Sequence, residues 1–287
     1  MLVLRFLNVV APVYFLCISL VTFALQLFLF IPSMFQGPSA TLLFSSALLH
    51  GALFLFLSAN ALGNYILVIQ NTPEDLAKED LNLGTAAAAA VAAGEAEGVP
   101  RDGLEDGSAS PGLALTGTHF CRLCARLTQR HDHHCFFTGN CIGSRNMRNF
   151  IMFCLYTSLA CLDSLVAGLS YISAVLSTSF ANPLAFLTLL PHSISQFFSG
   201  ALLSSEMFVI LMLYLWLGIG LACAGFCCHQ MLLILRGQTR HQVRKGMVVP
   251  AGPWKKNLEE VFGKRWMLGL LIPVLNVGTD RHGQKEK

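Results

Sequence analysis

The chain alternates between long apolar runs and shorter polar stretches. Four runs are each long enough to cross a bilayer, because a spanning helix needs roughly 20 mostly apolar residues. They extend from about Val9 to Phe30, Phe44 to Ile69, Phe150 to Val175 and Phe208 to Ile234. The first run has no small-residue cleavage site after a short apolar core, so it is expected to be retained and not removed as a signal peptide. The pattern predicts an all-α integral membrane protein with four transmembrane helices.

Composition and the placement of charge strengthen this prediction. Of 287 residues, 54 % are hydrophobic and only 12 % are charged, which excludes an ordinary soluble domain. One of the 19 Lys and Arg precedes the first run, seven lie between the second and third, and eleven follow the fourth. Cytosolic loops carry the excess of Lys and Arg, so both termini and the central loop are expected in the cytosol.

Polar residues within the apolar runs have two interpretations. His50, Asn60 and Asn64 are expected to hold helices together, with a chemical role as the alternative. For Asp163 a functional role and a structural role are equally open. Near the end of the last run, Cys227 and Cys228 are either packing residues or sites of acylation.

Three other segments have a distinct character. Residues 71–115 hold acidic, alanine-rich and Gly/Ser/Pro-rich stretches without periodicity, which predicts a disordered cytosolic linker. Ser177 to Ser205 is apolar, but a fifth span there would move the basic tail across the membrane, so an interfacial or re-entrant segment is expected. The tail contains a predicted amphipathic helix from Trp254 to Trp266, which lies either on a membrane surface or against the protein.

Cys and His are concentrated in the central loop, between Cys121 and Cys141. The cytosol is reducing, so such a cluster indicates metal binding or catalysis and not disulfides. The Cys121-x2-Cys124 spacing places two thiolates on one tight turn, as in zinc knuckles. A tetrahedral site needs two more ligands, and the downstream candidates are His131, His133, His134, Cys135 and Cys141.

The run Asp132-His133-His134-Cys135 also holds the parts of an activated nucleophile. A neighbouring imidazole lowers the pKa of a thiol, and an adjacent carboxylate orients that imidazole. We therefore expect Cys135 to be the nucleophile, His133 its base and Asp132 the residue that orients the base.

Adjacent histidines point differently on most backbones, so His133 and His134 are not expected to share one metal. With His133 assigned to catalysis, the expected zinc ligands are Cys121, Cys124, His134 and Cys141. The alternative is a purely structural zinc finger in which Cys135 is a ligand and no reaction occurs.

These motifs resemble a known family. Asp132-His133-His134-Cys135, followed by Asn140-Cys141-Ile142-Gly143, Asn146 and Phe150, is similar to the cysteine-rich domain of the DHHC protein S-acyltransferases, or palmitoyltransferases. Four spans with a cytosolic cysteine-rich loop between the second and third match that family too. The resemblance implies that Cys135 takes a long-chain acyl group, mainly palmitoyl, from acyl-CoA as a thioester and passes it to a cysteine of a membrane-associated protein. It supports the same zinc ligands and implies that Phe150 lines the acyl pocket.

The chain departs from the family pattern at several positions. The family has two zinc sites, but here the first Cys pair is missing, and Phe120 and Leu127 replace a ligand His and a ligand Cys. We expect one structural zinc, although His119 is close enough to be a stray ligand. Phe137 stands for a Trp and keeps an aromatic wall in the acyl pocket. Thr239-Arg240-His241-Gln242 replaces a Thr-Thr-x-Glu motif, which leaves its contacts to the site in doubt.

The sequence thus predicts a small zinc-stabilised cysteine-rich domain between the second and third of four helices. The expected divisions are 1–70 and 150–235 for the helix pairs, 71–115 for the linker, 116–149 for the cysteine-rich domain and 236–287 for the tail. The predicted activity is protein S-acylation, with acyl-CoA, membrane-associated protein substrates and the bilayer as partners and no nucleic acid. A weakly active or inactive adaptor that binds partners through its zinc finger is the alternative. The resemblance to the family implies a location in the endoplasmic reticulum or Golgi.

Overall fold

The computed structural model describes residues 2–33, 40–72, 118–177, 180, 184–246 and 252–264, and side chains from residue 47 onward in the second helix. The predicted linker lies outside these residues from position 73 to 115. Within the described residues, four helices are long and apolar enough to cross a membrane, which confirms the predicted spans. They are α1 (Leu2–Leu25, continued by the π-helical turn η1, Gln26–Phe30, and by α2, Ile31–Ser33), α3 (Ala40–Gln70), α5 (Met147–Leu176) and α7 (Ser204–Leu235).

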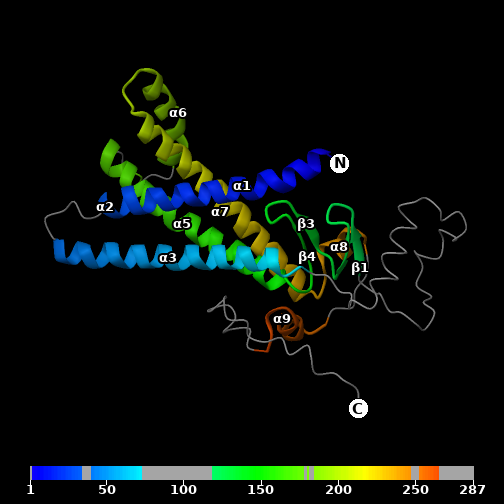
Figure 1. The fold of residues 1–287 in the computed structure, drawn as a ribbon. Coiled ribbons are helices and arrows are strands. Elements are labelled where there is room, and N and C mark those ends of the chain that lie inside the picture. Colours follow the sequence, from blue (N-terminus) through cyan, green and yellow to red (C-terminus); the bar gives the residue numbers. More distant parts are fainter. Residues whose placement is uncertain are drawn as a thin grey trace, which may run out of the picture.

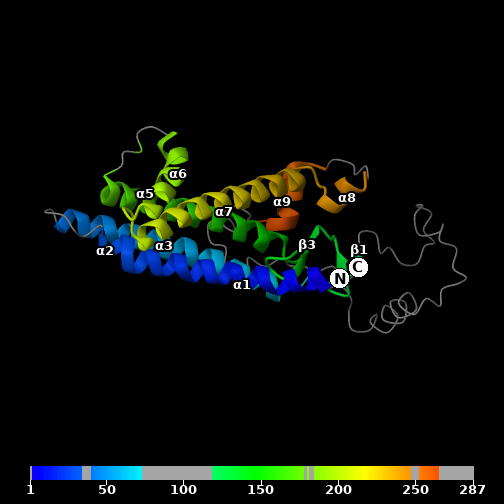
Figure 2. The same cartoon turned by 90° about the horizontal axis from the view of Figure 1, so that it is seen from above.

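The four helices run side by side, and the strands lie beyond one end of them (Figures 1 and 2). Helix α5 packs against both α3 and α7. At Gly168 of α5, an added Cβ would lie 2.5 Å from the Leu213 side chain and 3.1 Å from Trp216, so the small residue allows α7 to approach closely. Close packing matters here because lipid tails give apolar helices no hydrophobic reason to associate.

Polar side chains join the helices away from the strands. His50 Nδ1 lies 3.4 Å from Asp163 Oδ1, and its Nε2 lies 3.1 Å from Gln26 Oε1. Gln26 Nε2 donates to Ser164 Oγ at 3.2 Å. These contacts link η1, α3 and α5, so His50 and Asp163 both contribute to holding the bundle together.

The cysteine-rich segment forms two short antiparallel hairpins. Strand β1 (Thr118–Cys121) pairs with β2 (Arg126–Gln129), and β3 (His133–Cys135) pairs with β4 (Asn140–Ile142). Sequence reasoning predicted a zinc-stabilised domain here but not its strands. The remainder of the described chain is mostly helical, as expected.

The segments before and after α7 bear on two open alternatives. Helix α6 (Leu184–Phe198) has 15 residues, fewer than the roughly 20 that a span requires. Helix α9 (Trp254–Phe262) buries Leu258 and Phe262 in the apolar core shared with α5 and α7. It therefore docks against the protein, and it ends four residues before the predicted Trp266, at Gly263 with φ +82°. The short helix α8 (Arg240–Arg244), which follows α7 and precedes α9 in the sequence, lies beside the strands (Figure 1).

Candidate active site and metal centre

The β3–β4 hairpin separates the two predicted sets of residues. His134 is paired with Cys141 across the hairpin, while His133 and Cys135 are paired with Ile142 and Asn140. Successive side chains of a strand point to opposite faces. His134 and Cys141 therefore share one face of the hairpin, and His133 and Cys135 share the other.

On the first face, one nitrogen and three sulfur atoms come together. Nδ1 of His134 lies 3.3 Å from Cys124 Sγ and 3.7 Å from Sγ of both Cys121 and Cys141. Sγ of Cys141 lies 3.5 Å from Sγ of Cys124. Zinc bonds of about 2.3 Å to sulfur and 2.0–2.1 Å to nitrogen place tetrahedral ligand atoms about 3.5–3.8 Å apart. The four side chains thus fit a Cys3His zinc site.

Asn8, near the start of α1, holds the ring of His134. Its Oδ1 lies 2.9 Å from His134 Nε2, which leaves Nδ1 directed at the three sulfur atoms. Metal-binding histidines usually donate a hydrogen bond from the N–H of their second ring nitrogen to an oxygen acceptor in this way. Gly139 lies against the same residue, with φ +61° and its Cβ position 3.4 Å from the Asn8 carbonyl oxygen. No feature of the sequence indicates this role for Asn8.

On the opposite face, His133 connects Asp132 to Cys135. His133 Nδ1 lies 2.8 Å from Asp132 Oδ2. Burial lowers the pKa of His133, but hydrogen bonds to Asp132 and Cys135 outweigh it and raise that pKa to about 9. Burial raises the pKa of the Cys135 thiol, yet the hydrogen bond and charge of His133 outweigh it and the net pKa is lowered. The arrangement favours an imidazolium–thiolate pair, the nucleophilic form of cysteine.

Two further groups bind Asp132, which is only 4 % exposed. Gln230 Nε2 in α7 donates to Oδ2 at 2.7 Å, and the Arg240 backbone N–H donates to Oδ1 at 2.7 Å. Burial raises the pKa of this carboxyl, but the bonds from His133 and Arg240 outweigh it and lower the pKa. Buried carboxylates need such donors. The sequence left in doubt whether residues 239–242 contact the active site. This contact is present, and the Arg240 backbone N–H makes it.

Thr239 and Gln242 shape the segment that carries this backbone donor. Thr239 Oγ1 accepts from Gln242 N at 3.3 Å, and Gln242 Oε1 accepts from Thr239 N at 2.8 Å. This reciprocal pair is a capping box, in which Gln serves as well as Glu. Helix α8 therefore begins immediately after Thr239, where the amide of Arg240 reaches Asp132.

Two asparagines tie the hairpin to the end of α3. Asn140 Nδ2 donates to Val68 O at 3.0 Å, and Asn146 Nδ2 donates to Val68 O and Cys141 O at 3.2 and 2.9 Å. Asn146 Oδ1 also accepts from Gly143 N at 2.9 Å. Carbonyls in the last turn of a helix have no partner within it, so these amides satisfy groups that would otherwise be unpaired.

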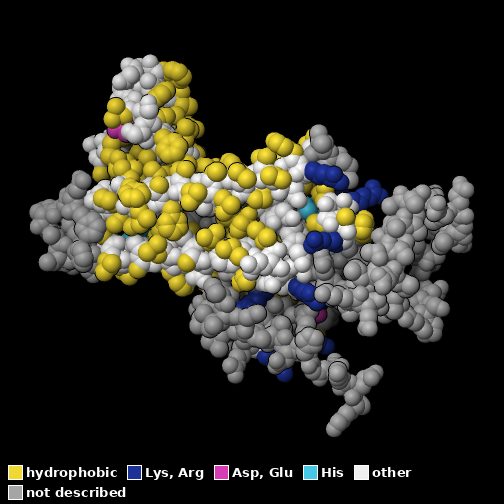
Figure 3. All heavy atoms as spheres, viewed as in Figure 1, with side chains coloured by type: hydrophobic (Ala, Val, Ile, Leu, Met, Phe, Trp, Pro, Cys, Tyr) yellow, Lys and Arg dark blue, Asp and Glu magenta, His cyan; other side chains and the backbone are white. Residues whose placement is uncertain are grey.

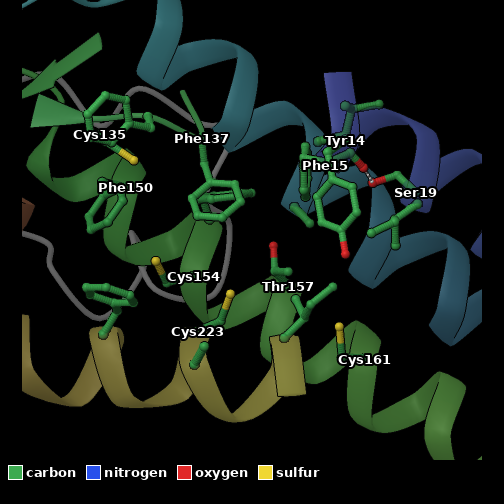
Figure 4. A pocket seen from close by; sticks show the side chains of 18 of the residues that line it. Tyr14, Phe15, Ser19, Cys135, Phe137, Phe150, Cys154, Thr157, Cys161 and Cys223 are labelled. Atoms are coloured by element: carbon green, nitrogen blue, oxygen red, sulfur yellow. Dashed lines mark hydrogen bonds between the residues drawn. The ribbon is translucent and has the colours of Figure 1, made fainter. Parts of the chain in front are cut away.

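A cavity of about 1350 Å³ begins beside Cys135 and continues between the helices. Cys135 and Phe150 lie at one end of it, and Thr157, Cys161 and Cys223 lie farther along α5 and α7 (Figure 4). Phe150 packs edge-on to His133 with ring centroids 5.1 Å apart. Phe137 lines the cavity as well, and its carbonyl accepts from the Tyr65 hydroxyl at 3.0 Å.

Three other histidines meet at the strand end of this cavity. His119 of β1, His131 and His241 of α8 have ring centroids 4.6 to 5.7 Å apart. Burial lowers the pKa of His131 to about 4, with a smaller contribution from the other two rings. The sequence suggested His119 only as a stray ligand for a lost site, and it did not link His131 with His241.

Comparison with known proteins identifies the family. The DHHC palmitoyltransferase family model matches residues 114–246. Palmitoyltransferase ZDHHC22 of Mus musculus and that of Homo sapiens are each 70 % identical over 287 residues, covering 100 % of both chains. Palmitoyltransferase ZDHHC22 of Danio rerio is 46 % identical over 278 residues, covering 96 % of this chain and 94 % of the relative. These similarities support the predicted enzyme class, protein-cysteine S-palmitoyltransferase. The chain belongs to the family of DHHC palmitoyltransferases.

Proposed function

We propose that this chain transfers a fatty acyl group, mainly palmitoyl, from acyl-CoA to cysteines of membrane-associated proteins in two steps. The Cys135 thiolate attacks the thioester carbonyl of acyl-CoA, the bond to the CoA sulfur breaks, and His133 supplies the proton to the departing thiolate. A thiol of the substrate protein then loses its proton to His133 and attacks the Cys135 thioester, which releases the Cys135 thiolate. The observation that carries this proposal is the hydrogen-bonded set Asp132–His133–Cys135 at the end of the cavity.

The cavity is suited to an acyl chain. The side chains that line it deep between the helices are mostly apolar, and include Phe153, Trp216 and Ile219. Each buried CH₂ contributes about 0.8 kcal/mol, so a long chain that enters the cavity is bound strongly while its carbonyl stays near Cys135. In this proposal Phe137 and Phe150 line the cavity next to the carbonyl.

The charge distribution supports a cytosolic active site. On the face seen in Figure 3, apolar side chains cover the helical body and Lys and Arg gather around the strands. The positive-inside rule places this end, with both termini, in the cytosol, where acyl-CoA is available. The chain is a multi-pass membrane protein, and location in the endoplasmic reticulum or Golgi is part of the proposal. The domain boundaries at residues 70, 115, 149 and 235 are also part of the proposal.

In the proposal, the metal site is structural. Cys121, Cys124, His134 and Cys141 supply four ligands, which leaves no open position for substrate, as is typical of structural zinc. Bound zinc would add stability that the short hairpins lack, since such small strands are marginal alone. The chain's own residues then perform the reaction, with β3 holding His133 and Cys135 in position.

The decisive experiment compares wild type with Cys135→Ser and Cys17→Ser in cells given an alkyne-tagged fatty acid. Cys17 is an exposed residue of α1 that does not line the cavity and belongs to neither proposed set. We expect a hydroxylamine-sensitive label on wild type and on Cys17→Ser and none on Cys135→Ser, with substrate acylation following the same order. Equal labelling of wild type and Cys135→Ser contradicts the assignment of the nucleophile. Absence of both self-labelling and substrate acylation in wild type would favour the adaptor.

A further inference from the structure

The sequence predicts one zinc ion, but the geometry points to a second metal site, formed by His119, His131 and His241, that binds a divalent transition metal ion, with zinc as the expected occupant. Within the described part of the chain, these residues and the Cys3His cluster are the two groups whose ligand atoms gather closely enough for a metal. One ring nitrogen of each histidine lies within 4.8 Å of the others. The proposal does not depend on acyl transfer, since none of the three residues takes part in the proposed reaction.

Both ring nitrogens of His131, Nδ1 and Nε2, are buried without a hydrogen-bond partner. The residue is 9 % exposed. A buried polar group without a partner costs free energy, about 1–3 kcal/mol by mutational measures. The rings of His119 and His241 lie beside it, but neither makes a hydrogen bond to it. A metal ion between the three rings would satisfy His131.

The type of ligand selects the type of metal. Imidazole nitrogen suits Zn²⁺, Cu²⁺ and Ni²⁺, whereas Mg²⁺ and Ca²⁺ prefer oxygen. For Zn–N bonds of about 2.0–2.1 Å the three nitrogens would lie about 3.4 Å apart, which is within the 4.8 Å limit on their present separation. Three protein ligands leave a fourth position for water, and all three residues line the cavity, so that position is reachable from it.

Neighbouring charges act in both directions. Arg244 and Lys245 are close enough to His241 to disfavour a cation, and Lys245 acts on His119 as well. The Asp132 carboxylate favours a cation at His131 and His241, but the charged ring of His133, which is paired with that carboxylate, opposes one at His131. Arg244 and Lys245 are exposed, and charges in water are screened more strongly than buried ones. Charge therefore does not favour a cation here, so the imidazole nitrogens must supply the affinity, which we expect to be weaker than at the Cys3His site.

A metal here would join three separate segments. His119 lies in the β1–β2 hairpin, His131 immediately precedes Asp132, and His241 immediately follows Arg240, whose amide binds Asp132. An ion shared by the three rings would hold α8 against the catalytic carboxylate. We infer that this site ties the C-terminal segment to the cysteine-rich domain and can gain and lose its metal while the Cys3His site stays occupied.

The test counts metal in full-length protein purified in detergent. Protein is incubated with excess Zn²⁺, separated from free ions by gel filtration and analysed for zinc per chain. Wild type and the control His192→Ala, an exposed residue of α6, are expected to hold two ions. His131→Ala and His241→Ala are expected to hold one. Loss of a residue that hydrogen-bonds a metal ligand lowers metal affinity by about 10–100-fold. Loss of one of the three ligands themselves should lower the zinc affinity of this site by more than that.

Cobalt distinguishes the two sites. Co²⁺ bound to thiolates gives an intense charge-transfer absorption, which reports on the Cys3His site alone. This band should be the same in wild type and both histidine variants, showing that the hairpins are folded. If His131→Ala fails to fold, His241→Ala decides, because His241 is only partly buried. One zinc per wild-type chain, or two in His241→Ala, overturns the proposal.

Discussion

His133 and His134 are neighbours in the sequence, yet their rings meet different surroundings. His134 has three thiols on one side and the Asn8 amide on the other. His133 lies between a buried carboxylate and Cys135, against the ring of Phe150. One set of surroundings suits a fully coordinated metal and the other suits a mobile proton. Strand geometry alone creates the difference, because alternation sends the two side chains to opposite faces.

The sharpest way to break this comparison is to replace each histidine with Gln. His134→Gln should abolish thiolate-bound metal and with it acyl transfer, because a structural zinc site contributes directly to folding. His133→Gln should lower acyl transfer by about 10²–10⁴-fold while leaving the thiolate-bound metal unchanged. Cobalt absorption and a fatty-acid labelling assay on purified protein measure the two effects. Loss of thiolate-bound cobalt in both variants would mean that the faces are not separate.

Asp132→Asn tests the catalytic face through the residue that orients the base. The amide cannot stabilise a charged imidazole and presents the wrong hydrogen-bonding pattern to Nδ1, so labelling of Cys135 should slow by about 10²–10⁴-fold. The thermal midpoint and the thiolate-bound metal should change little in comparison. A rate within a factor of three of wild type would contradict the role of Asp132.

Asn8→Ala tests the metal face. Loss of the acceptor at His134 Nε2 should weaken zinc binding at the Cys3His site by about 10–100-fold, measured by competition with a chelator. Asn8→Asp keeps an oxygen acceptor and serves as the matched control. If the Ala and Asp variants bind zinc equally well, the contact does not orient His134.

Gln230→Leu should have the smallest effect. It removes one of the donors to Asp132, but the Arg240 amide and His133 remain, so the rate should fall by about tenfold. Gln238→Leu, a neighbouring change without contact to Asp132, should leave the labelling rate unaltered. Equal rates for the Gln230 variant and wild type would show that the carboxylate needs no third donor.

The sequence predicted much of the fold because membrane helices are set by length and apolarity alone. All four predicted spans match helices, and the proposed zinc ligands meet in space. It predicted less of what surrounds the site. Asn8 and Gln230 reach the cysteine-rich domain from helices distant in the chain, and a single polar residue in an apolar run has several equally good explanations. The three-histidine cluster was hidden for the same reason, since His241 joins it only through the docking of α8.

The hydrogen bond from the Arg240 amide to Asp132 has a consequence for how such chains diverge. A peptide N–H is present in every residue type except proline, so the contact constrains where the backbone passes and not which side chain occupies the position. The side chains of this sequence motif can therefore change while the hydrogen bond to Asp132 persists. Conversely, Arg240→Pro would erase a contact that no other replacement at this position removes directly.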